Sequence, residues 1–153
     1  MRVEIIVGSM LGASEYVADA LAAKLETLGI HSEIYLTPDM QQLDQDNLWC
    51  ICTSTHGAGD LPDNIQPFAE QLKQQQLPRV NYIIIGLGDS SYDTFCEGGK
   101  QMHQLMQSAK ANSLSEPLYI DVLHHPIPED EAETWLENLF EQPQFKQYIK
   151  PLC

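Results

Sequence analysis

Positive charge is scarce in this sequence. Of its 153 residues, 8 are Lys or Arg and 22 are Asp or Glu, which leaves a formal net charge of -14. A nucleic-acid partner requires cations that displace the counterions of its phosphates, and an anionic membrane surface attracts basic segments in the same way. Nucleic acid and membrane are therefore not expected partners. The acidity instead favours a basic protein, which opposite charge attracts over a distance.

The sequence also lacks long apolar segments and paired cysteines. No stretch reaches the roughly 20 apolar residues that cross a bilayer. Glu4 interrupts the apolar start and no small-residue cleavage site follows, so residues 3–7 are interpreted as a strand and not as a signal peptide. The four cysteines form neither a C-x-x-C pair nor a spacing typical of zinc ligands. This pattern favours a reducing compartment, and the expected location is the cytoplasm.

Short apolar runs alternate with amphipathic stretches along the chain. The runs predict strands at 3–7, 30–36, 48–53, 80–85 and 118–122. Helical spacing of apolar residues predicts helices around 17–28, 65–72, 102–109 and 132–140, and a shorter one around 41–44. Cys50 and Cys52 fall on one face of the third strand, where small buried side chains are expected. The alternation indicates an α/β domain, a parallel sheet with helices on both faces.

The loop after the first strand is the first part of the candidate site. In an open parallel sheet, ligands bind outside the carboxyl ends of the strands. Residues 8–15 run from a buried strand straight into a helix, and they include Ser9, Gly12 and Ser14. Their backbone N–H groups and the positive end of the helix dipole predict a phosphate site built without Lys or Arg. An ordinary tight turn would have the same pattern, so this loop alone leaves both interpretations open.

The loops after the third and fourth strands complete the candidate site. Residues 54–64 contain two glycines two positions apart, which let the backbone lie close to a ligand. His56, in the middle of this loop, could cover one face of a ring system, although most loop histidines are plain surface residues. Tyr92, in the loop 86–96, has an amphipathic ring suited to stacking on a planar ligand. A purely structural loop tyrosine is the alternative.

Together the three loops resemble the FMN loops of flavodoxins. Residues 54–64 have the form S-T-x-G-x-G-D-x-P-D-N, which is common in the FMN domains of diflavin reductases. The same loop, the run 88–96 and the stretch 98–101 resemble the short flavodoxin-like family of MioC and YqcA, as do Pro128 and Trp135 near the end. The resemblance covers about residues 1–141. It implies a single-domain flavodoxin-like doubly wound sheet, with five parallel strands in the order 2-1-3-4-5 and helices on both faces.

Beyond that domain, residues 142–153 are expected to form a loosely held C-terminal tail, because Pro143 and Pro151 interrupt any regular structure.

The resemblance also implies FMN as the cofactor and assigns the residues that bind it. The FMN phosphate would lie on the first loop, on Ser9, Met10, Leu11, Gly12, Ala13 and Ser14. One side of the flavin ring would meet Ser54, Thr55, His56 and Gly57. The other side would meet Leu87, Gly88, Asp89, Ser90, Ser91 and Tyr92, with Phe95 and Cys96 closing the pocket. Many flavodoxins carry threonines where this chain has Met10 and Leu11, so weaker FMN binding is expected.

The implied function is the shuttling of single electrons between a reductase and an acceptor protein, without an enzymatic activity of its own. The expected partners are basic redox proteins, such as a flavodoxin/ferredoxin NADP reductase and an acceptor enzyme. An NAD(P)H-dependent FMN or quinone reductase is an alternative, but its nicotinamide phosphate would need arginine, and only Arg2 and Arg79 exist. A flavin-free interaction module is the other alternative, because Met10 and Leu11 remove hydroxyl donors.

Overall fold

Strands and helices alternate along the chain, as the apolar pattern predicts. The computed structural model describes residues 2–10 and 12–148. Its elements are β1 (Val3–Gly8), α1 (Ala13–Thr27), β2 (Ser32–Tyr35), the 3-10 helix η1 (Met40–Gln42), β3 (Leu48–Thr53), α2 (Gln66–Leu72), β4 (Asn81–Gly88), α3 (Glu97–Ser108), β5 (Asn112–Ser113), β6 (Leu118–Asp121), α4 (Pro128–Leu139) and the 3-10 helix η2 (Pro143–Tyr148). Within these ranges no helix is both long and apolar enough to cross a membrane.

The strands form one parallel sheet in the order β2-β1-β3-β4-β5, which confirms the predicted order 2-1-3-4-5. The fifth position is divided between two short strands. β5 pairs with the start of β4, and β6 pairs with its end. The sequence predicts only β6, because β5 consists of two exposed polar residues without an apolar run. Pro117, which has no N–H for a ladder, lies in the gap between the two strands.

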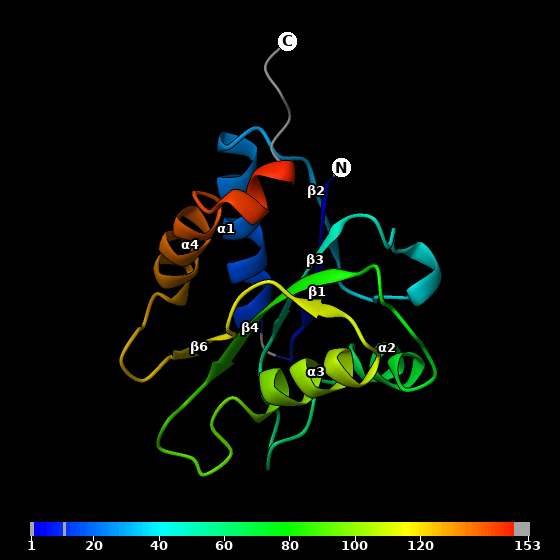
Figure 1. Ribbon diagram of the computed structural model, residues 1–153. Coiled ribbons are helices and arrows are strands. Elements are labelled where there is room, and N and C mark those ends of the chain that lie inside the picture. Colours follow the sequence, from blue (N-terminus) through cyan, green and yellow to red (C-terminus); the bar gives the residue numbers. More distant parts are fainter. Residues whose placement is uncertain (1, 11, 149–153) are drawn as a thin grey trace.

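Helices cover both faces of the sheet. Figure 1 shows α1 and α4 together on one face and α2 and α3 on the other. Successive residues of the central strands alternate between the two layers, so that Ile5 packs under α1 and Ile6 packs on the α2 side. Every residue of β1 and β3 is buried, which explains why these strands appear in the sequence as apolar runs that only Glu4 interrupts.

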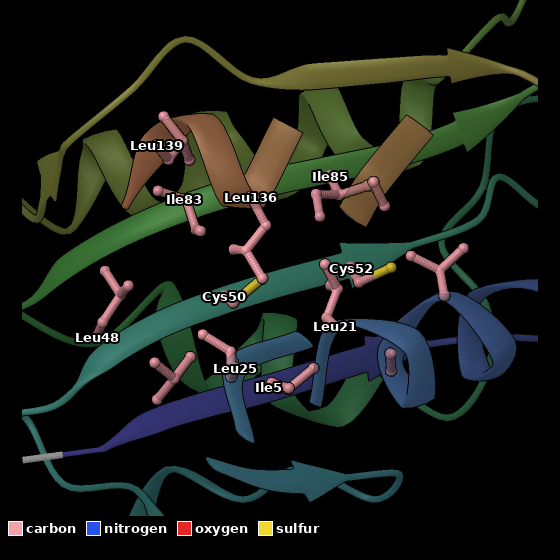
Figure 2. Packing of buried hydrophobic residues seen from close by; sticks show 14 of the residues in the cluster. Ile5, Leu21, Leu25, Leu48, Cys50, Cys52, Ile83, Ile85, Leu136 and Leu139 are labelled. Carbon is pink, nitrogen blue, oxygen red and sulfur yellow. The ribbon is translucent and has the colours of Figure 1, made fainter. Parts of the chain in front are cut away.

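The prediction of buried cysteines on the third strand is confirmed. Figure 2 shows Cys50 and Cys52 among the apolar side chains between the sheet and the helices α1 and α4, next to Leu21 and Leu136. Both thiols are free, and burial raises the pKa of Cys50 to about 12. These thiols therefore stay protonated and act as packing groups.

The structure corrects the expectation of a loosely held tail for its first part. Residues 143–148 form η2, in which Phe145 and Tyr148 are buried in the same core as α1 and α4. The Phe145 ring packs 5.2 Å from that of Phe140, and the Tyr148 hydroxyl accepts a hydrogen bond from Asn81 Nδ2 at 3.1 Å. The prolines suggested a loose tail, but burial of two aromatic rings holds this segment. The rest of the tail, residues 149–153, lies outside the described residues.

Candidate functional site

A cavity of about 620 Å³ opens where β1, β3 and β4 end. This volume suits a cofactor-sized ligand. The three predicted loops all contribute to its lining. It is lined by Met10 and Ala13 from the first loop, Ser54, Thr55, His56 and Gly57 from the second, Leu87, Gly88, Asp89, Tyr92 and Thr94 from the third, and Val122 after β6.

The second loop is fixed on both sides by hydrogen bonds. Ser54 N donates to the Gly8 carbonyl at 3.0 Å, and the hydroxyls of Ser54 and Ser14 lie 2.5 Å apart. On the other side, the Thr55 hydroxyl accepts from Gly98 N at 3.0 Å. Glycine is required at position 98, because a Cβ there would overlap the carbonyl oxygen of Ser54. The start of α3 can therefore approach this loop closely and hold it against β4.

Residues 56–60 form a tight turn at the cavity. His56 N donates to the Asp60 carbonyl at 2.7 Å, and Asp60 N donates to the His56 carbonyl at 2.8 Å. Gly57 and Gly59 have φ angles of 52° and 104°, which favour glycine. A Cβ at Gly57 would meet no atom within 4 Å. The backbone angle at position 57, and not crowding by neighbouring atoms, is therefore what favours glycine there.

The first loop leads into a helix that no side chain caps. Gly12, with φ 92°, is the N-cap residue of α1, and its N–H donates to the Ser9 hydroxyl at 2.9 Å. The first-turn N–H groups of an uncapped helix remain available to an anion, and the helix dipole adds a favourable field. Ser14 differs from the expectation, because it is buried and joins the first loop to Ser54 and does not line the cavity. Leu11 lies outside the described residues.

The third loop presents an exposed ring. Tyr92 lines the cavity and is 66% exposed, so one of its faces is free for a ligand. Asp89 shapes the turn by accepting hydrogen bonds from Ser91 N at 2.8 Å and from the Ser91 hydroxyl at 2.6 Å. Asp121 Oδ1 accepts from Ser90 N at 3.1 Å, and hydrogen bonding from Ser90 lowers the pKa of the Asp121 carboxyl. The loop is thus ordered by two carboxylates.

Some of the predicted residues are not among those that line the cavity. They are Ser9, Gly12, Ser14, Ser90, Ser91, Phe95 and Cys96. Cys96 is buried with φ 54°, its sulfur donates to the Gly86 carbonyl at 3.5 Å, and burial raises its pKa to about 12. Sequence reasoning missed Thr94 and Val122. The strand order could have indicated Val122, because the loop after the fifth strand reaches the same edge of the sheet.

The sequence model of the Flavodoxin family matches residues 5–135. Protein MioC of Escherichia coli (strain K12) is 43% identical over 136 residues, which cover 88% of this chain and 92% of that protein. Flavodoxin YqcA of the same strain is 39% identical over 141 residues, 90% of this chain and 95% of its own length. The structure of a cysteine-to-alanine mutant of flavodoxin from Pseudomonas aeruginosa has a TM-score of 0.83 and 31% identity, and the match covers 99% of this chain and 100% of that one.

The chain therefore belongs to the flavodoxin family, as a short-chain member of the MioC/YqcA type. This membership implies FMN as the cofactor and the general function of an FMN-binding electron carrier. The residues present fit that cofactor. The cavity has the size and the exposed aromatic ring for a flavin, and the uncapped start of α1 beside it offers backbone donors for a phosphate.

Proposed function

We propose that this protein accepts single electrons from a reductase and passes them to an acceptor protein, through FMN held in the three-loop cavity. Convergence of the three loops on one cavity at the carboxyl edge of the sheet is the observation that carries this proposal. FMN supplies the one-electron chemistry when bound, and the protein sets its position and surroundings.

The three loops divide the work of binding. The start of α1, together with Ser9 and Gly12, holds the phosphate, mainly through backbone N–H groups, because Met10 has no hydroxyl. Tyr92 would stack on one face of the ring system, because its exposed ring lines the cavity and is free to receive a planar ligand. Gly57 lets its peptide reorient toward the ring when the flavin is reduced, at low steric cost.

Acidic side chains around these loops select the partner. Asp60, Asp63, Asp89 and Asp93 belong to the second and third loops, in a chain of net charge -14. A basic redox protein, such as a flavodoxin/ferredoxin NADP reductase, would be attracted to this edge, and an acceptor enzyme would use the same attraction. The rate of association should fall as salt is added.

The positions of the two arginines favour a carrier over an NAD(P)H-dependent reductase. Arg2 precedes β1 and donates through Nε to Glu4 at 2.8 Å. Arg79 precedes β4, with its Nη2 3.8 Å from Asp46. Both lie at the amino edge of the sheet, whereas the cavity is at the carboxyl edge. Neither guanidinium is placed to hold a nicotinamide phosphate at the flavin.

Anaerobic reduction of the FMN-loaded protein tests the proposal. With NADPH alone, the flavin absorbance should stay that of the oxidised form. With NADPH and a catalytic amount of a flavodoxin/ferredoxin NADP reductase, it should bleach, and the rate should fall with salt. A protein that ignores FMN would be a flavin-free module, and one that oxidises NADPH unaided at a steady rate would be an enzyme. The cytoplasmic location stays a prediction.

A further inference from the structure

One asparagine at the carboxyl edge of the sheet ties three segments together. Asn64 Nδ2 donates to the carbonyl of Val7 at 2.7 Å and to that of Leu36 at 2.9 Å. Its Oδ1 accepts from Ser9 N at 2.9 Å. The partners come from the end of β1, the segment after β2 and the first loop, while Asn64 itself follows β3. A single side chain thus fixes where the first loop leaves the sheet.

The contact extends from Ser9 to the start of α1. Ser9 is held through its N–H by Asn64, and its hydroxyl accepts from Gly12 N at 2.9 Å. Gly12 is the N-cap residue of α1, whose first-turn N–H groups have no side-chain cap. The direction of these N–H groups therefore depends on Ser9, and Ser9 depends on Asn64.

We propose that Asn64 is the positioning residue for the phosphate end of the FMN site, an inference that rests on the proposed function. The first loop has Met10 and Ala13 where hydroxyl or amide side chains could have bound a phosphate directly. Phosphate binding then relies on backbone N–H groups, which are effective only when the loop holds them in one direction. Asn64 supplies that constraint from outside the loop without touching the cavity.

The amide group suits this position chemically. Two donors must reach the carbonyls of Val7 and Leu36 while an acceptor faces Ser9 N. A carboxylate would set an oxygen against both carbonyls, and a serine hydroxyl is too short to span the three groups. Alanine would leave all three backbone groups without this partner, and the first loop would lose its defined direction.

The test compares FMN with riboflavin, which has the same ring system but no phosphate, as ligands of the wild-type protein and Asn64→Ala. We expect the Kd for FMN to rise by about tenfold or more, because a hydrogen-bonded constraint is lost. The Kd for riboflavin should change by less than about twofold, because the ring contacts are intact. Flavin fluorescence quenching measures both constants.

Asn112→Ala is the matched control. Asn112 Nδ2 also donates to two backbone carbonyls, those of Pro78 at 2.9 Å and Val80 at 3.3 Å, but at the amino edge. This variant should bind both flavins as the wild type does. If Asn64→Ala does not fold, Asn64→Ser, which keeps one hydroxyl, replaces it with the same expectation.

Unchanged FMN binding in the Asn64 variant, or equal weakening for FMN and riboflavin, would overturn the proposal and leave Asn64 a structural residue. A wild-type protein that binds neither flavin would instead overturn the proposed function. The two failures are therefore distinguishable.

Discussion

The two edges of the sheet treat polar groups in opposite ways. At the amino edge, the fully buried Glu4 accepts from Arg2 Nε at 2.8 Å, from the Tyr35 hydroxyl at 3.2 Å and from Asp44 N at 3.1 Å. At the carboxyl edge, the helix start at Gly12 has no side-chain cap, and the Tyr92 ring is exposed. The amino edge thus uses a buried carboxylate for stability, whereas the carboxyl edge, whose loops Asn64 and Asp121 fasten, also keeps helix N–H groups and an aromatic ring free for a ligand.

The largest expected loss of stability comes from a substitution at the amino edge, and this substitution should leave the affinity for FMN unchanged. Glu4→Ala leaves the Arg2 guanidinium and the Tyr35 hydroxyl without their buried partner, and we expect the free energy of unfolding to fall by about 3 kcal/mol. Urea unfolding of the FMN-free protein measures this loss. The Kd for FMN should match that of the wild type, since the cavity lies at the opposite edge.

Glu33→Ala is the control for that change. Glu33 is an exposed carboxylate that lies 3.8 Å from Arg2, so its loss should cost less than about 0.5 kcal/mol. If the Glu4→Ala protein is folded and still binds FMN more weakly than the wild type, the two edges are coupled, and the contrast between them does not hold.

A smaller loss of stability, accompanied by weaker FMN binding, is expected from a substitution at Gly98. Gly98→Ala adds a Cβ that overlaps the Ser54 carbonyl, although alanine favours a helix more than glycine does. We expect a net loss of about 2 kcal/mol in unfolding free energy, because the overlap must be relieved by moving the backbone. The displaced second loop should also weaken FMN binding, as followed by flavin fluorescence.

Gln107→Ala, an exposed change on the same helix, should leave both quantities unchanged. A Gly98→Ala protein as stable as the wild type would mean that the approach of α3 to Ser54 is not close in solution.

These two regions also show what a sequence can and cannot predict. The positions of the main strands and the three loops were predictable, because buried parallel strands are mostly apolar and the loops carry glycine patterns, whereas the strand order followed from the family resemblance. The β5 strand was missed because its two polar residues are held by pairing with β4. The burial of Phe145 was missed because Pro143 suggested a loose tail. The hydrogen bond between Ser14 and Ser54 joins residues 40 positions apart, and no local pattern records it.

A smaller effect is expected on the midpoint potentials of FMN bound at the carboxyl edge. Gly57 has φ 52°, which asparagine tolerates and valine does not, while a Cβ has free space there. Gly57→Val should strain the turn by about 1–2 kcal/mol and hinder the peptide from reorienting. The separation between the first and second one-electron midpoint potentials of bound FMN should narrow, as measured by spectroelectrochemistry.

Gly57→Asn should keep a separation closer to that of the wild type. Equal separations in the valine variant and the wild type would rule out peptide reorientation as the cause of any stabilisation at this position.

The smallest expected effect is on FMN binding at acidic pH, and it involves the third loop. Hydrogen bonding from Ser90, together with that from Leu123 N, holds the pKa of Asp121 below its usual value. A carboxyl whose folded pKa is lowered contributes stability above its unfolded pKa, and this contribution is lost as pH falls through the folded value. FMN should therefore dissociate more readily below about pH 4. Asp121→Asn should flatten this part of the pH profile, measured by flavin fluorescence.

Because Asp121 fastens the loop that carries Tyr92 and does not line the cavity, its titration should change the rate of FMN release more than the spectrum of bound FMN. If the pH profiles of Asp121→Asn and the wild type are identical, the acid sensitivity comes from the flavin phosphate or from other carboxylates. The charge of Asp121 would then not contribute to the ordering of the third loop.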